Sequence, residues 1–197
     1  AFAAQAGVVL GQRATAEKSN EKTAIPELLA TLALEGSIVT IDAMGTQPNI
    51  AQAIRDRGAD YLLAVKDNQP KLAESIDDFF IAFEAAPAKT PHQFHEVVEK
   101  DHGRIEVRRC HVFNQLDCLH APERWPDLKS FVVITTERTI RGKATSTERR
   151  VYLSSLPPDA QRMNQSVRQH WRVENSLHWC MDVVFGDDQM RARTDHA

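Results

Sequence analysis

The sequence has few cysteines, and their spacing matches neither a disulfide framework nor a zinc-binding motif. Its 197 residues include three, Cys110, Cys118 and Cys180, which are scattered and form no CxxC pair. An odd, scattered set indicates reduced thiols in a cytoplasmic protein.

Long apolar runs are missing as well, and the opening residues do not have the pattern of a signal peptide. No apolar stretch approaches the ~20 residues that span a bilayer, so we expect no membrane partner. The opening AFAAQAGVVLGQ has no basic region and is interrupted by Gln5 and Gly7, which argues against a signal peptide. The chain has no initiator Met and ends in polar MRARTDHA, so we expect a piece cut from a longer protein.

Excess positive charge and a glycine-rich phosphate loop are also absent. The net charge of −3 and pI near 6.3 give no basic footprint for nucleic acid, although local patches matter more than the total. The lack of a phosphate loop argues against an α/β small-molecule enzyme. A hydrophobic content of 42% supports one core, with room for an inserted subdomain.

Hydrophobic patterning predicts an α/β first half. Ala1–Gln5 and Val8–Ala14 flank Gly7 as a hairpin, and Pro26 suits the first turn of a helix that ends at Gly36. The next elements are a strand at Ile38–Ile41, a helix from Pro48 to Gly58, a strand at Tyr61–Val65 and a helix from Pro70 to Phe83. Strand, helix and strand at this spacing form a βαβ unit with a parallel pair.

The pattern becomes β-like between residues 91 and 156. We expect strands at Arg104–Val112, Phe131–Thr136 and Arg149–Leu153. Pro157 and Pro158 then open a long amphipathic helix. This order indicates a discontinuous core with a β-rich insertion.

Asp42 is a candidate metal ligand. It follows an apolar strand and precedes Gly45, and open α/β sheets bind ligands beyond the carboxyl ends of their parallel strands. The alternative is a simple turn-forming Asp, and position alone favours neither.

Glu174 lies on the late helix, in the segment QHWRVENSLHW. His170, Glu174, His178 and Asp182 recur at i, i+4 spacing and form one stripe. A solvated helical Glu is the plain alternative, and a zinc site is weaker because His-x-x-x-Glu is unspecific. We expect Trp171 and Trp179 to be packing residues.

Four separated motifs resemble the DDE-type transposases of the H-repeat-associated (ISAs1-like) insertion sequences. The segment from His170 to Asp182 is similar to their H-W-x-I-E-N-x-L-H-W-x-L-D signature, and Ile41–Gly45 matches I-D-A-M-G. KDNQ at Lys66–Gln69 and HGRIE at His102–Glu106 also resemble the family. The four motifs occur in order over nearly the whole chain.

The resemblance implies an RNase H-like α/β core with a β-rich insertion before the final catalytic helix. The expected parts are a first core segment at 1–90, the insertion at 91–156 and the final core helix, which carries the third acid, at 157–197. Asp42 and Glu174 would be the catalytic acids and ligands of Mg²⁺ or Mn²⁺, with His178, Asp182 and Asn175 as supporting residues. The first acid would lie upstream of Ala1, so this fragment is expected to be catalytically silent.

The implied activity is transposition, by metal-dependent cleavage at element ends and strand transfer into target DNA. Its predicted DNA-binding residues are Lys66, Asn68, Gln69, Arg104 and Arg108. A polar helix-entry loop and a solvated mixed-charge surface are equally good explanations of these residues. The resemblance also implies a bacterial, nucleoid-associated protein, which could form a homodimer at full length. The alternatives are an inactive or domesticated remnant with a binding or structural role, and another RNase H-like nuclease.

Overall fold

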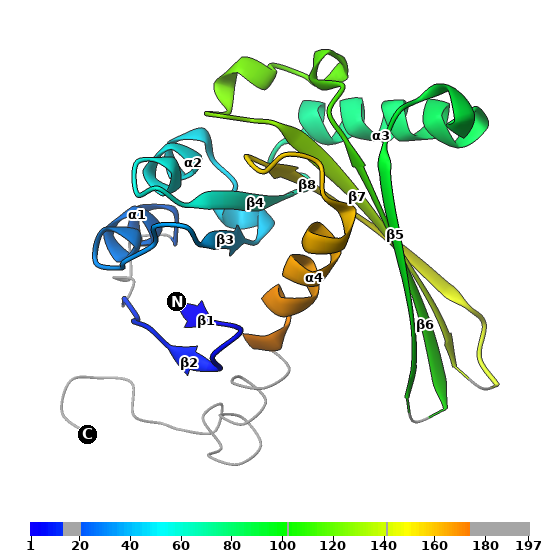
Figure 1. The fold of residues 1–197 in the computed structure, drawn as a ribbon, viewed down its shortest axis with the longest axis horizontal. Coiled ribbons are helices and arrows are strands. Elements are labelled where there is room, and N and C mark those ends of the chain that lie inside the picture. The colour runs from blue at the N-terminus through cyan, green and yellow to red at the C-terminus, as the bar shows by residue number, and fades with distance from the viewer. Residues whose placement is uncertain (14–20, 102, 141, 174–197) are drawn as a thin grey trace.

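The fold is a mixed six-stranded sheet with helices on both faces (Figure 1). A computed structural model describes residues 1–13, 21–101, 103–140 and 142–173. The strands of the sheet, in the order β3-β4-β8-β7-β6-β5, are β3 (Ile38–Ile41), β4 (Asp60–Val65), β8 (Ser146–Ser154), β7 (Ser130–Ile140), β6 (Arg104–Phe113) and β5 (Gln93–Asp101). A small antiparallel hairpin, β1 (Phe2–Ala3) with β2 (Val8–Val9), forms a separate sheet.

Two apolar clusters attach the helices to the sheet. Helices α1 (Glu21–Ala30), α2 (Pro48–Arg55) and α3 (Pro70–Ala85) pack on one face, against alternate residues such as Tyr61 and Leu63 of β4. Helix α4 (Ala160–His170) packs on the other face, where Met163 and Val167 contact the cluster that contains Leu62 and Ala64. Strand β4 is therefore buried on both sides, which explains its continuous apolar sequence. None of the described helices is long and apolar enough to cross a membrane.

Several predicted elements are confirmed. Strands β3 and β4 are parallel, with Ile38 opposite Asp60 and Ile41 opposite Leu63. Helices α2 and α3 begin at the predicted prolines, and the expected N-terminal hairpin is present with shorter strands.

The prediction for the first helix was wrong at both ends. Helix α1 begins at Glu21, so Pro26 lies inside it, and it ends at Ala30, before Gly36. The extra turn brings Ile25 against the core. This packing offsets the loss of the backbone hydrogen bond that proline cannot donate. Helix α4 begins three residues after Pro157, because the Asp159 side chain accepts a hydrogen bond from the Arg162 N–H and caps it there.

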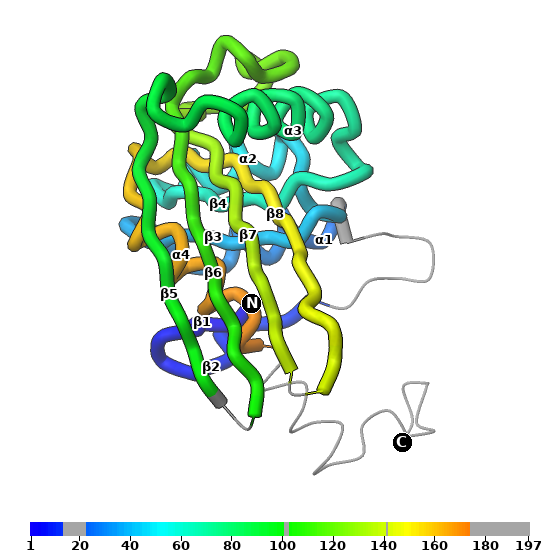
Figure 2. The backbone as a smooth tube through the Cα atoms, turned by 90° about the vertical axis from the view of Figure 1, so that its right-hand side faces the viewer, coloured from blue at the N-terminus to red at the C-terminus, as the bar shows by residue number. Residues whose placement is uncertain are grey.

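The β-rich stretch continues the main sheet. Strand β8 pairs antiparallel with β4, so the strands from β5 to β8 extend the β3–β4 pair without a break. Figure 2 shows these four strands side by side, extending away from α3 as a long arm. The division into 1–90, 91–156 and 157–197 stays a prediction, because continuity of the sheet does not define domain boundaries.

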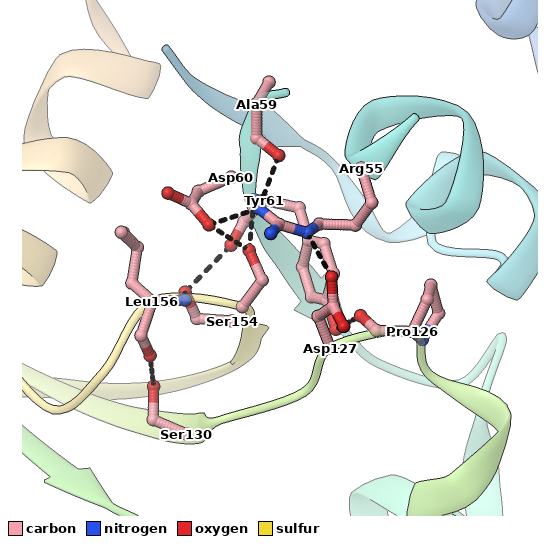
Figure 3. Close-up of polar contacts among 10 residues, drawn as sticks. Arg55, Ala59, Asp60, Tyr61, Pro126, Asp127, Ser130, Ser154 and Leu156 are labelled. Atoms are coloured by element: carbon pink, nitrogen blue, oxygen red, sulfur yellow. Dashed lines mark hydrogen bonds and ion pairs between the residues drawn. The ribbon is translucent and has the colours of Figure 1, made fainter. Parts of the chain in front are cut away.

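Arg55 ties together the end of the sheet where β4 begins (Figure 3). Its guanidinium donates to Asp60 at 2.6 Å and to Asp127 at 2.8 Å, and also to the Ala59 carbonyl. The Tyr61 hydroxyl donates to the Pro126 carbonyl at 2.9 Å. These bonds connect α2, β4 and the loop before β7.

Replacing Arg55 with Ala should lower the free energy of unfolding by about 1–3 kcal/mol, because charge-assisted bonds to two carboxylates are lost. Chemical denaturation of the two proteins measures the difference. Arg57→Ala is the matched control, because Arg57 is exposed on the turn after α2. Equal midpoints for Arg55→Ala and Arg57→Ala would contradict the structural role.

Candidate catalytic cleft

Asp42 directly follows β3 and begins a tight turn. Its Oδ1 accepts a hydrogen bond from the Ala43 N–H at 2.7 Å, which caps the short 3-10 helix η1 (Ala43–Gly45). Gly45 is required in this turn: an added Cβ would lie 2.5 Å from Ile41 Cγ2 and 2.8 Å from Ile25 Cδ1. The I-D-A-M-G sequence therefore fixes Asp42, whose side chain is exposed, at the carboxyl end of the strand.

The loop after β3 is tied to the end of β4. The buried Thr46 hydroxyl donates to the Ala64 carbonyl at 2.6 Å. The side-chain amides of Asn68 and Gln69 both donate to the Thr46 carbonyl at 3.2 Å. The KDNQ segment thus positions the turn that carries Asp42, a role that the sequence did not reveal.

Asp42 lines a cleft of about 790 Å³, which we call the Asp42 cleft. Its wall includes Lys66 and Asp67 after β4, Arg150 and Tyr152 of β8, and Trp171 after α4. It continues past the end of β4 to Asp77 and Glu84 of α3. The fold therefore brings segments that are far apart in the sequence to one hollow.

The cations in the cleft differ in their partners. Arg149 pairs with Glu84 at 3.2 Å and with Asp77 at 3.7 Å. Arg150 pairs with Glu148 at 2.8 Å, and its guanidinium lies 4.2 Å from the centre of the Trp171 ring. Lys66 is exposed and has no ion-pair partner among the described residues, so it is the cation best placed to meet an added anion.

Tyr152 is buried beside Asp42. Burial raises the pKa of Tyr152 to about 12, and the negative charge of Asp42 adds to the rise, while Arg150 and Trp171 act in the opposite direction. The hydroxyl therefore stays protonated at neutral pH. Tyr152 was not singled out as a site residue from the sequence, and Arg150 was considered only as one of several basic residues in the β-rich segment that could contact DNA phosphates.

Helix α4 is fixed against the strand that carries Asp42. His170 Nδ1 lies 3.0 Å from the Thr40 hydroxyl, in a hydrogen bond between the end of α4 and β3. Thr40 is two residues before Asp42, and His170 is four residues before Glu174. The contact joins the two elements expected to carry the acids. Glu174, Asn175, His178 and Asp182 themselves lie outside the described residues.

Asp42 fits a magnesium ligand by its chemistry. Mg²⁺ prefers carboxylate oxygens with open access to water, and Asp42 is exposed with one oxygen held by its own turn. Asp67 adds a second carboxylate to the cleft wall. Within the described part of the chain no three His, Cys, Asp or Glu side chains gather as a metal site.

The transposase DDE domain family matches residues 1–197 in full. The chain belongs to this family. It is 39% identical over its whole length to the "H repeat-associated putative transposase YhhI" of Escherichia coli, covering 53% of that protein. It is 40% identical, again over its whole length, to YncI of another Escherichia coli strain, whose name also describes a transposase, and covers 51% of it. This transposase domain thus spans about half the length of these relatives, and no solved structure matches it.

The other predicted DNA-binding residues of this transposase domain lie away from the cleft. Arg108 is only 7% exposed and pairs with Glu106 at 2.8 Å and Glu99 at 3.3 Å. Burial alone would raise the pKa of Glu106, but Arg108 and Arg138 outweigh it and hold that pKa below its ordinary value. Arg104 is half-buried at the far end of β6. This placement gives no support to phosphate contacts by Arg108, whose guanidinium is already occupied.

Thr40→Val should weaken the attachment of α4 to β3, because valine keeps the shape of threonine but removes the hydroxyl bonded to His170. We expect the melting temperature to fall by about 2–4 °C and amide exchange in α4 to accelerate. Hydrogen exchange followed by mass spectrometry makes the measurement.

Thr40→Ser keeps the hydroxyl and serves as the control. If amide hydrogen exchange in α4 is the same in Thr40→Val as in the unmodified protein, this hydrogen bond does not hold the helix in place.

Proposed function

We propose that this domain carries two of the acids, Asp42 and Glu174, of a metal-dependent transposase that at full length cleaves DNA at element ends before transferring strands to a target. The observation that supports this is the position of Asp42 in one cleft with Trp171, which is three residues before Glu174. In the sequence, Glu174 follows His170 at i, i+4 spacing, which predicts that both lie on one face of the late helix.

The residues of the cleft suit phosphoryl transfer. Asp42 would hold a metal ion, Mg²⁺ or Mn²⁺, through its carboxylate. When bound, a metal pair stabilises charge on the attacking and leaving oxygens of an in-line displacement. Exposed Lys66 would contact a phosphate beside Asp42, while Asn68 and Gln69 hold the turn in place.

The remaining residues have supporting roles in this proposal. His178, Asp182 and Asn175 would orient Glu174, as outer partners orient metal ligands elsewhere. Tyr152 is buried and stays neutral, so it would line the cleft beside Asp42 without adding charge. The three-part division, with residues 91–156 as an insertion between the acids, belongs to the same proposal.

The decisive test uses a longer protein that contains this domain together with upstream sequence. Asp42→Asn and Glu174→Gln should each reduce magnesium-dependent nicking of an element end by more than the roughly 10–100-fold typical of outer-shell partners. Gel analysis of labelled element ends gives the rates. The exposed Glu123→Gln is the matched control and should cleave normally.

Two outcomes would contradict the proposal. Cleavage that survives Asp42→Asn would place the chemistry elsewhere. A longer protein that binds DNA but never cleaves it, with either metal, would favour an inactive remnant with a binding role.

Metal binding can be measured separately from cleavage. Fe²⁺ with ascorbate and peroxide cuts a polypeptide near a bound metal, so we expect cuts near Asp42 that Mg²⁺ competes away. The isolated domain should bind weakly and not cleave DNA, because two of three acids leave water to complete the coordination shell. If iron cuts the Asp42→Asn polypeptide at the same positions and to the same extent, Asp42 is not a ligand of the metal.

A further inference from the structure

Strand β5 is a long edge of the sheet. It spans nine residues, Gln93–Asp101, and pairs with β6 along one side only; it ends the order of the six strands. No other described strand lies along its outer side. Folded proteins usually cover or interrupt such an edge, because its free N–H and C=O groups are ready to pair with another strand.

Exposed apolar side chains gather beside this edge. Phe94 and Val98 of β5 are 51% and 52% exposed, and Ile105 of β6 is 42% exposed. The register places Val98 opposite Val107 and Lys100 opposite Ile105, so these residues share the face that α3 covers elsewhere. The edge therefore offers both free backbone groups and an apolar stripe.

We propose that β5 pairs antiparallel with β5 of a second copy of this chain, about a two-fold axis at Val98. In this register residue 98 faces residue 98 of the partner, and residue 96 faces residue 100. The two Val98 side chains then continue the row that Val107 begins in each copy. Both copies contribute the same strand, as a closed two-fold interface requires.

Charge complementarity selects this register and a second copy as the partner. It places Glu96 opposite the partner's Lys100 twice, once on each side of the axis. Glu96 already accepts a hydrogen bond from Arg109 at 2.7 Å, so a row of alternating charge would cross the interface. Moving the axis by one residue, to Val97, would set Glu96 against valine and lose both charge pairs.

The proposed interface does not cover the Asp42 cleft of either copy. Strand β3, which leads to Asp42, is at the opposite edge of the sheet from β5. Each Asp42 cleft would therefore lie at an outer end of the doubled sheet. The inference does not depend on the proposed metal chemistry, and it can fail while that proposal stands.

The test measures the mass of residues 1–197 by sedimentation velocity across a range of concentrations. We expect a monomer–dimer equilibrium. Val98→Lys should abolish the dimer, because it sets like charges directly opposite at the axis. Lys100→Glu should weaken it about ten-fold, since both charge pairs become repulsive, and added salt should reduce that effect.

Mixing two variants gives the sharpest result. Glu96→Lys and Lys100→Glu should each dimerise poorly alone, but a mixture should form a heterodimer, because every pair at the interface then joins opposite charges. The double variant E96K/K100E should dimerise like the unmodified chain. Lys129→Glu, an equal change of charge on an exposed residue before β7, should have no effect.

Thermal melts of each variant separate a failed fold from a lost interface, and the exposed Val98 and Lys100 should tolerate substitution. A monomer at all concentrations would overturn the proposal. A dimer that persists in Val98→Lys, or a mixture of variants that stays monomeric, would overturn it as well.

Discussion

The pairing of β4 on both of its edges is the constraint on which the rest of the structure depends. Its parallel pairing with β3 orients the turn that carries Asp42, and its antiparallel pairing with β8 attaches the four-stranded arm. Tyr61, Leu62 and Leu63 are almost completely buried, so β4 contributes to the apolar clusters on both faces of the sheet as well. Burial of apolar surface on two faces stabilises the strand far more than its backbone hydrogen bonds alone.

The Asp42 cleft is a consequence of unequal strand lengths. Strand β8 begins at Ser146, but β4 ends opposite Val151, so the first part of β8 extends beyond its neighbour. The hollow forms where β4 stops, and Asp42, Lys66 and Arg150 line it from three elements. An arm of different length would leave Asp42 on an open edge, without the aromatic wall of Tyr152 and Trp171.

Charged residues have two different functions in this domain. On the arm, Arg108 and Glu106 satisfy each other inside a network that also includes Arg138. This network explains the HGRIE motif as a structural feature of β6, since an unpaired charge would be costly at that depth. Around the Asp42 cleft the charges are more exposed, and Lys66 keeps its ammonium free of the described carboxylates.

The sequence predicted the parts of the structure that depend on local chemistry. The β-branched run Ile38–Ile41, the prolines at the starts of α2 and α3, and the Asp-Ala-Met-Gly turn have strong local preferences. It failed at α1, where burial of Ile25 adds a turn before Pro26. It also gave no strand at Gln93–Asp101, because that segment has little alternation and becomes a strand through its pairing with β6.

By itself, the sequence determined the family, the parallel β3–β4 pair and the position of Asp42 at a strand end, because each depends on a short motif or a local hydrophobic period. Only the tertiary structure decided which side chains surround Asp42, that Asn68 and Gln69 hold its turn, and that Arg108 is buried in ion pairs. These facts depend on contacts between residues far apart in the chain, and no local pattern records which distant segment will supply the partner.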